Sequence, residues 1–94
     1  MIRSFADREA ETIWNGRRSR KLPVDIQAVA LRKLRLLNQS RTIEDTRIPP
    51  GNRLEALKGN RKGQFSIRIN EQWRICFKWN EGGPGDVEIV DYHD

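Results

Sequence analysis

The sequence predicts one small α+β domain in which two N-terminal helices pack on one face of a mostly antiparallel sheet. Apolar residues recur at helical spacing through the first forty residues, whereas they alternate with polar residues in the second half. The chain has 94 residues, a length that supports one core and leaves no room for a second. Residues 1–94 are therefore expected to form a single domain.

The first forty residues predict a short strand followed by two helices. Residues 2–5 suit a first strand, and residues 7–15 suit a helix with Asp7 as its N-cap. A longer helix is expected from Pro23 to residue 38 or 39. Its core-facing stripe, set by helical spacing, is Ile26, Ala30, Leu34 and Leu37.

The positive charge of the chain is concentrated in its first half. The net charge is +5, and residues 1–50 hold 11 Lys and Arg against 6 Asp and Glu, whereas residues 51–94 are balanced. A basic half favours polyanionic partners such as nucleic acid or the ribosome. The connection at residues 16–22 reads GRRSRKL, which is either a solvated connector or a loop that contacts phosphates. On the second reading, its RNA contacts are Arg17, Arg18, Arg20 and Lys21.

Residues 40–63 predict irregular structure with one strand inside it. Residues 40–52 form the longest connection, and two prolines and a glycine near its end exclude a helix interior or a central strand. Residues 53–58 suit a strand, although Leu54 and Leu57 break strict alternation. The glycines of residues 59–63 indicate a turn.

The clearest predicted element is the β-hairpin that follows this turn. Apolar and polar residues alternate on both arms, so the pairing register decides which face each side chain takes. A two-residue turn would oppose Ile69 to Arg74 and mix the faces. A three-residue loop at residues 70–72 pairs Ile69 with Trp73 and sets Arg68 opposite Arg74, and we expect that register. Its other pairs are Phe65 with Phe77, Ile67 with Ile75 and Gln64 with Lys78.

A glycine-rich turn at residues 80–86 is expected to lead into a last strand at residues 87–92. Two helices can cover only one face of this sheet, so the other face should be open and carry Arg68 and Arg74. Like charges directly opposite one another are destabilising unless an anion lies over them. The arginine pair therefore predicts a phosphate-facing surface.

Side chains suited to RNA cleavage should converge on this surface if the C-terminal tail folds back beside the arginines. Metal-independent cleavage needs a base for the 2′-hydroxyl, cations for the phosphorane and an acid for the 5′-oxygen. The candidates are Arg74, Arg68 and Lys58 as cations, Tyr92 to orient a phosphate or stack a base, and Asp91 with His93 for proton transfer. A histidine one residue from the end can equally be frayed and solvated.

The composition argues against several other classes. No run approaches the roughly 18 apolar residues of a membrane span, and the N-terminus lacks the apolar stretch of a secretory signal. The single cysteine, Cys76, cannot form an internal disulfide, so a reducing cytoplasm is the expected compartment. Neither a phosphate-binding glycine loop nor metal-ligand spacing is present, so no cofactor and no metal are expected.

Three short motifs occur in a specific order in the second half. They are Leu-Lys-Gly at residues 57–59, Asn-x-x-Trp-Arg at residues 70–74 and Asp-Tyr-His at residues 91–93. With the opening Met-Ile-Arg-Ser-Phe and a helix–helix segment of the right length, this set resembles the HigB family of killer toxins in the RelE-like superfamily. The resemblance implies a RelE-like, microbial RNase-type fold, and it implies catalytic roles for Lys58, Arg74, Asp91, Tyr92 and His93.

The same resemblance implies the toxin of a type II toxin-antitoxin module. Its activity would be ribosome-dependent endonucleolytic cleavage of mRNA, which inhibits translation and growth. Its partners would be a HigA-type helix-turn-helix antitoxin, the ribosome and the message, with operator DNA reached only through the antitoxin. Two other interpretations stay open, a non-catalytic ParE-like inhibitor of DNA gyrase and a small non-toxic nucleic-acid-binding domain.

Overall fold

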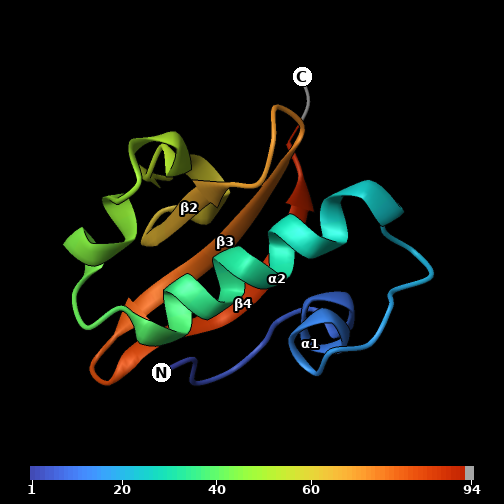
Figure 1. Ribbon diagram of the computed structural model, residues 1–94. Coiled ribbons are helices and arrows are strands. Elements are labelled where there is room, and N and C mark those ends of the chain that lie inside the picture. The colour runs from blue at the N-terminus through green and yellow to red at the C-terminus, as the bar shows by residue number, and fades with distance from the viewer. Residues whose placement is uncertain (93–94) are drawn as a thin grey trace.

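Two helices pack on one face of a four-stranded antiparallel sheet in the computed structural model, which describes residues 1–92 (Figure 1). The strands lie in the order β1-β2-β3-β4. The fold class predicted from the sequence is confirmed. The elements are α1 (Arg8–Trp14), α2 (Val24–Gln39), β1 (Glu55–Ala56), β2 (Gln64–Arg68), β3 (Trp73–Asn80) and β4 (Gly83–Asp91).

One carboxylate begins α1 and also attaches it to the sheet. Asp7 is the N-cap, as predicted, and its Oδ1 accepts a hydrogen bond of 3.0 Å from the backbone N–H of Glu9. Its Oδ2 accepts a second bond of 3.2 Å from the N–H of Ile89 in β4. The buried stripe of α2 is the predicted one, so the core lies between the two helices and the sheet.

The N-terminal run and the last strand differ from prediction. Residues 2–5 form no full strand, and Phe5 makes a single parallel bridge to Val87. The strand predicted at residues 87–92 instead starts at Gly83, after a two-residue turn that pairs Asn80 with Gly83. Gly83 has φ +130, and a Cβ there would collide with the backbone of Met1, so the N-terminal segment can approach this closely only at a glycine.

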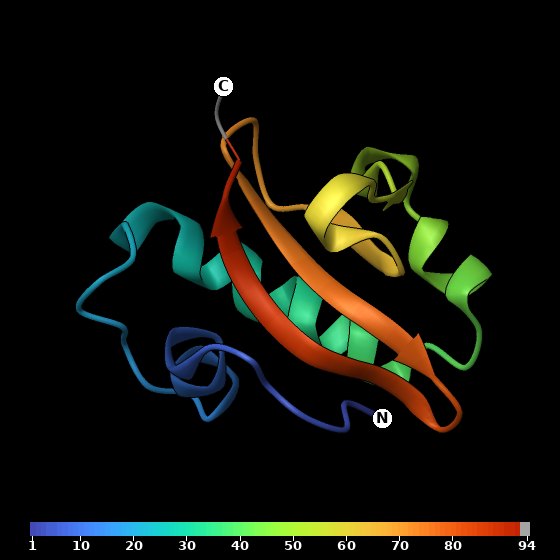
Figure 2. The same cartoon turned by 180° about the vertical axis from the view of Figure 1, so that it is seen from behind.

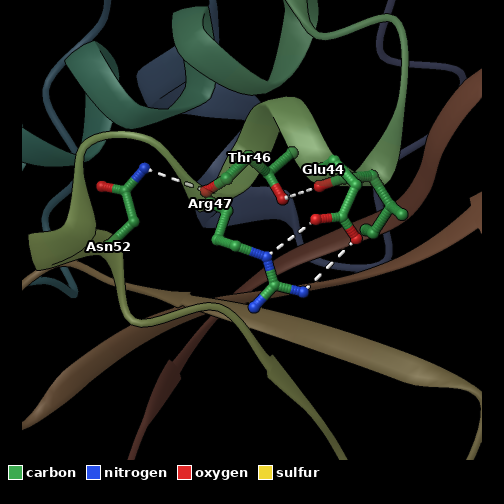
Figure 3. Close-up of polar contacts among 5 residues, drawn as sticks. Glu44, Thr46, Arg47 and Asn52 are labelled. Atoms are coloured by element: carbon green, nitrogen blue, oxygen red, sulfur yellow. Dashed lines mark hydrogen bonds and ion pairs between the residues drawn. The ribbon is translucent and has the colours of Figure 1, made fainter.

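The long connection after α2 holds more local structure than predicted. It contains two 3₁₀ helices, η1 (Ile43–Arg47) and η2 (Pro50–Asn52). Figure 3 shows the buried Asn52 donating from Nδ2 to the carbonyl of Thr46 at 3.1 Å, while Glu44 and Arg47 pair on the surface at 2.9 Å. The strand predicted at residues 53–58 is reduced to β1, because it pairs with β2 over only two residues.

The register predicted for the β2–β3 hairpin is confirmed. Ile67 pairs with Ile75 and Arg68 with Arg74, around a loop of three residues that lie beyond the Ile69–Trp73 backbone bond. Asn70 orders this loop, because its Oδ1 accepts from the N–H groups of Gln72 and Trp73 at 2.8 Å each. Alternation then places the large apolar side chains of both strands against the helices.

The sheet face opposite the helices is polar and is partly covered by the chain. Figure 2 looks onto this face, with α2 behind the strands. A third 3₁₀ turn, η3 (Gly59–Arg61), precedes β2 and sends Arg61 across the face to Glu88 of β4. Ser66 and Cys76, which point to this side, are fully buried.

Candidate active site

Arg74 is the centre of the polar sheet face, and it is buried rather than open. Its residue exposure is 8%, which corrects the expectation of an uncovered arginine. The Nε donates to Oγ of Ser66 at 2.8 Å, and Nη2 donates to the carbonyl of Arg53 at 2.5 Å. Two of the three guanidinium nitrogens are therefore held by the protein, which fixes the direction of the third.

The third nitrogen of Arg74 faces Glu55, a residue that sequence reasoning did not select. Nη1 lies 3.5 Å from Oε1 of Glu55, whose side chain is 54% exposed. Glu55 reaches this face because β1 pairs it with Ser66. A two-residue strand carries too little periodicity for the sequence to assign its faces, so no local signal could have identified Glu55.

The paired arginines of the hairpin are neutralised by the chain itself. Arg68 lies 3.7 Å from Glu71 of the hairpin loop, and Arg74 is paired with Glu55. Anions do lie beside this pair, but they are the Glu71 and Glu55 carboxylates of the chain itself, so the pairing alone does not indicate a bound phosphate. An incoming phosphate must therefore compete with Glu55 for the remaining face of the guanidinium.

Tyr92 lies on the same side of the sheet as Arg74. Its ring centroid is 5.8 Å from Cζ of Arg74, a cation–π distance, and the residue is 38% exposed. The backbone N–H of Tyr92 donates to the carbonyl of Gln72, which holds the end of the chain against the β2–β3 loop. The tail therefore does return to Arg74 as far as Tyr92. The roles predicted for His93 fall outside the described residues.

Asp91 and Lys58 are less directly associated with Arg74. Asp91 pairs with Trp73, so it shares the helix-side face of the sheet, and its Oδ2 accepts from Nε2 of Gln72 at 3.2 Å. Lys58 is exposed and occupies the N-cap position of η3, between β1 and the Arg61 turn. Their catalytic roles stay predictions.

Arg61 is a second, partly buried cation on this face, and the sequence did not indicate it. Nη2 donates to Oε1 of Glu88 at 2.9 Å and Nη1 donates to Oε1 of Gln64 at 3.0 Å, so the guanidinium spans from β2 to β4. Hydrogen bonding to the Glu88 carboxylate raises the pKa of Arg61 above its usual value, and the nearby Tyr92 contributes in the same direction. Its partner is 27 residues away in the chain, a separation that no sequence pattern marks.

The basic loop between the helices lies on the other side of the molecule from β2 and η3 (Figures 1 and 2). Ser19 is buried at 2% exposure, and its Oγ donates to Glu9 at 2.6 Å. Gln27 closes the loop with bonds to the backbone of Ser19 and Leu22. The four predicted RNA contacts are exposed on this ordered loop and are not brought to Arg74: Arg17, Arg18, Arg20 and Lys21.

Two hollows on the surface lie away from Arg74. One, of about 520 Å³, lies beside the β3–β4 turn, and the other, of about 600 Å³, lies between α2 and the η1 segment. Neither is lined by Arg74, Glu55 or Tyr92. Arg74 itself is buried, and the exposed part of the cluster belongs to Glu55 and Tyr92.

The two helices, the antiparallel sheet and the arginine-centred polar face together define the class of RelE-like α+β domains. The family profile of HigB-like toxins, described as RelE-like toxins of the type II toxin-antitoxin system HigB, matches residues 3–94. The chain therefore belongs to the HigB-like toxin family, and a type II system includes an antitoxin partner.

Named relatives agree with this assignment. Toxin HigB-1 of Vibrio cholerae is 42% identical over 83 residues, which is 87% of each chain. An uncharacterized protein of Haemophilus influenzae is 38% identical over 69 residues, 73% of this chain and 68% of its own length. Endoribonuclease HigB of Proteus vulgaris is 39% identical over 41 residues, 44% of this chain and 45% of its own. None of the described helices is long and apolar enough to cross a bilayer.

Proposed function

We propose that this chain is an endoribonuclease that cleaves messenger RNA on the ribosome and so stops translation and growth. The observation that carries the proposal is the Arg74 guanidinium, held rigidly by Ser66 and Arg53 with its third nitrogen directed to the exposed side. The name of the Proteus relative, an endoribonuclease, supports the same activity.

Arg74 would bind the scissile phosphate through Nη1. The 3.5 Å separation between Nη1 and Glu55 exceeds the roughly 2.7–2.9 Å of a charge-assisted hydrogen bond. A phosphate oxygen can therefore form the stronger bond at Nη1 without breaking those to Ser66 and Arg53. Because these bonds preorganise the guanidinium, it can stabilise the charge of the phosphorane without first reorienting.

Proton transfer would use groups on both sides of that phosphate. A phosphate on Nη1 lies beside the Glu55 carboxylate, which would take the proton of the adjacent 2′-hydroxyl. The 2′-oxygen then bonds to phosphorus, and the bond from phosphorus to the 5′-oxygen breaks. His93 would give the departing oxygen its proton, and Lys58 would add positive charge near the phosphate. The products are a 2′,3′-cyclic phosphate and a 5′-hydroxyl.

Tyr92 would stack a base of the message. Its ring lies beside the Arg74 guanidinium and is 38% exposed, on the side of the sheet opposite the helices. Stacking on an aromatic ring is worth about 1–3 kcal/mol per base and tolerates many sequences. Arg68 and the basic loop would then contact backbone phosphates of ribosomal RNA or message.

The remaining partners follow from this activity. A helix-turn-helix antitoxin of the HigA type would neutralise the toxin, and operator DNA would be reached only through that antitoxin. The compartment would be the cytoplasm, where translating ribosomes are available.

Primer extension on mRNA from expressing cells tests the proposal. Wild-type protein should produce new 5′ ends inside translated messages, whereas Glu55→Gln and Tyr92→Ala should abolish or strongly reduce them. Arg47→Ala, which removes an exposed ion pair on η1, serves as the matched control and should cleave like wild type. Growth arrest with intact messages and damaged DNA would contradict the proposal and favour gyrase inhibition.

A further inference from the structure

We propose that Arg61 and Glu88 form a positioning pair that sets the distance between the Lys58 segment and the Tyr92 segment of the active site. The inference deepens the proposed function and rests on it. It starts from the fact that the site residues come from three separate segments. Arg74 is on β3, Glu55 is in β1 with Lys58 just before η3, and Tyr92 directly follows β4.

These three segments are not held equally by the sheet. Backbone ladders join β1 to β2, β2 to β3 and β3 to β4, so β1 and β4 lie at opposite edges. The ladder between β1 and β2 covers two residues, and one more bond, from the N–H of Leu57 to the carbonyl of Gln64 at 2.8 Å, extends it to the residue before Lys58. The backbone bonds that follow, from Arg61 to Lys58 and from Lys62 to Gly59, stay inside the η3 turn, so a side-chain contact must fix this turn relative to β4.

Arg61 supplies this attachment from within the turn that follows Lys58. The N–H of Arg61 donates to the carbonyl of Lys58 at 3.2 Å, which makes both residues parts of the same 3₁₀ turn. The guanidinium then bonds Gln64 on β2 and Glu88 on β4. Because Cys76 of β3 pairs with Glu88, Arg61 passes over the middle strand to reach the far one.

The geometry makes this pair stronger than an ordinary surface ion pair. The side chains are 32% and 25% exposed, and the two arginine bonds go to different strands. Fully exposed pairs contribute little because water and salt screen them, and partial burial reduces that screening. Glu88 is also four residues before Tyr92, which directly follows β4, so the bond to Glu88 positions the turn relative to the segment that carries the ring.

The consequence is specific to the catalytic step. Loss of the pair releases the turn that carries Lys58, whereas Arg74 keeps its bonds to Ser66 and Arg53. Misplacement of about 1 Å in a catalytic group can lower the rate by roughly a hundredfold. The pair should therefore influence kcat much more than it influences the binding of RNA.

The test measures single-turnover cleavage of mRNA on purified ribosomes by Arg61→Ala, Glu88→Gln and the double variant. Each single variant should lower kcat roughly ten- to a hundredfold with KM changed less than about threefold, and the double variant should be no slower than the slower single. The reciprocal exchange, Arg61→Glu with Glu88→Arg, should recover part of the loss. Arg47→Ala with Glu44→Gln is the control pair and should match wild type.

Amide relaxation by NMR supplies a readout that a general loss of stability would not give. Residues 58–62 of Arg61→Ala should gain mobility, while the β2–β3 hairpin should stay as in wild type. Wild-type rates in both single variants, additive losses in the double variant, or losses that follow a lower melting temperature would each overturn the pair's positioning role. If the wild-type protein itself fails to cut ribosome-bound mRNA, the proposed function fails instead, which separates the two results.

Discussion

Arg74 shows how a buried charge can serve both folding and chemistry. It is the charged side chain that the described residues bury most deeply, and its bonds to Ser66 and the Arg53 carbonyl offset the cost of removing it from water. These partners are fixed by the fold, so the guanidinium reaches the surface with one nitrogen in a set direction. Glu55 lies next to that nitrogen, so an incoming anion must compete with its carboxylate.

We predict that Arg74→Lys costs more stability than Glu55→Gln. An ammonium cannot reproduce the planar fork that reaches Ser66 and Arg53 together, so one buried acceptor loses its donor at a cost of about 1–3 kcal/mol. Glu55 is 54% exposed, and losing its half of a solvated ion pair should cost less than about 1 kcal/mol. Urea denaturation of both variants gives the two free energies. Equal losses would contradict the assigned bonding.

Cys76 should be unreactive in the folded protein. Burial raises the pKa of its thiol above the usual value, and the residue has no exposed surface. A raised pKa lowers the fraction of thiolate, which is the species that alkylating reagents attack. Iodoacetamide at pH 8 should label native protein at least about a hundredfold more slowly than protein in urea. Comparable rates would show that the polar face opens readily.

At the scale of elements, a single carboxylate bonds both to α1 and to β4. Asp7 caps the helix through one oxygen and accepts from the N–H of Ile89 through the other. Because Tyr92 directly follows β4, this bond helps to set the position of Tyr92 relative to the helices. The bond from Asp7 to β4 therefore influences the position of Tyr92 indirectly, through the strand.

Asp7→Ala should destabilise the protein by more than the loss of an N-cap alone would. Loss of an N-cap typically costs about 0.5–2 kcal/mol, and here the strand N–H loses its acceptor as well. We expect about 2–3 kcal/mol from the two losses together. Asp7→Asn keeps one acceptor oxygen and should cost clearly less. Thermal unfolding of the two variants makes the comparison, and a loss below 0.5 kcal/mol for alanine, roughly the least that a cap contributes, would contradict the double role.

The sequence predicted an element where a local pattern of apolar residues sets its structure. It failed where contacts with residues far away in the chain set the bounds of an element or the place of a side chain. The β2–β3 register followed from alternation, because only a three-residue loop places Ile67 and Ile75 on one face. The start of β4 was missed, since Gly83 and Pro84 resemble a loop until the close approach of the N-terminal segment is known. Glu55 and Arg61 were missed for the same kind of reason, because tertiary pairs place them at the site.

At the scale of the whole molecule, two groups of cations lie on different sides. One is the sheet face around Arg74, whose charges are largely matched by carboxylates of the chain. The other is the loop at residues 16–22, held by Ser19 and Gln27 with its cations exposed. The net charge of +5 comes from the first half of the chain, so residues of that half should produce most of the long-range attraction to RNA.

Neutralising the loop should weaken docking without stopping chemistry. Gln at positions 17, 18, 20 and 21 removes four positive charges and leaves Ser19 and its bonds in place. Binding to ribosomes should weaken, and the slope of log affinity against log salt should fall by up to about three. The melting temperature should be unchanged. An unaltered slope would show that the loop makes no phosphate contacts and only connects the two helices.

The central claim is that the Arg74–Glu55 pair on the polar sheet face is the chemical centre. Its most direct test is the single-turnover rate on ribosome-bound mRNA whose scissile 5′-oxygen is replaced by sulfur, a leaving group that needs no acid. Glu55→Gln should remain slower than wild type by about a hundredfold or more on both substrates, because the step it serves, proton removal from the 2′-hydroxyl, is unchanged. Full recovery of Glu55→Gln on the sulfur substrate, or wild-type rates on the natural one, would contradict the claim.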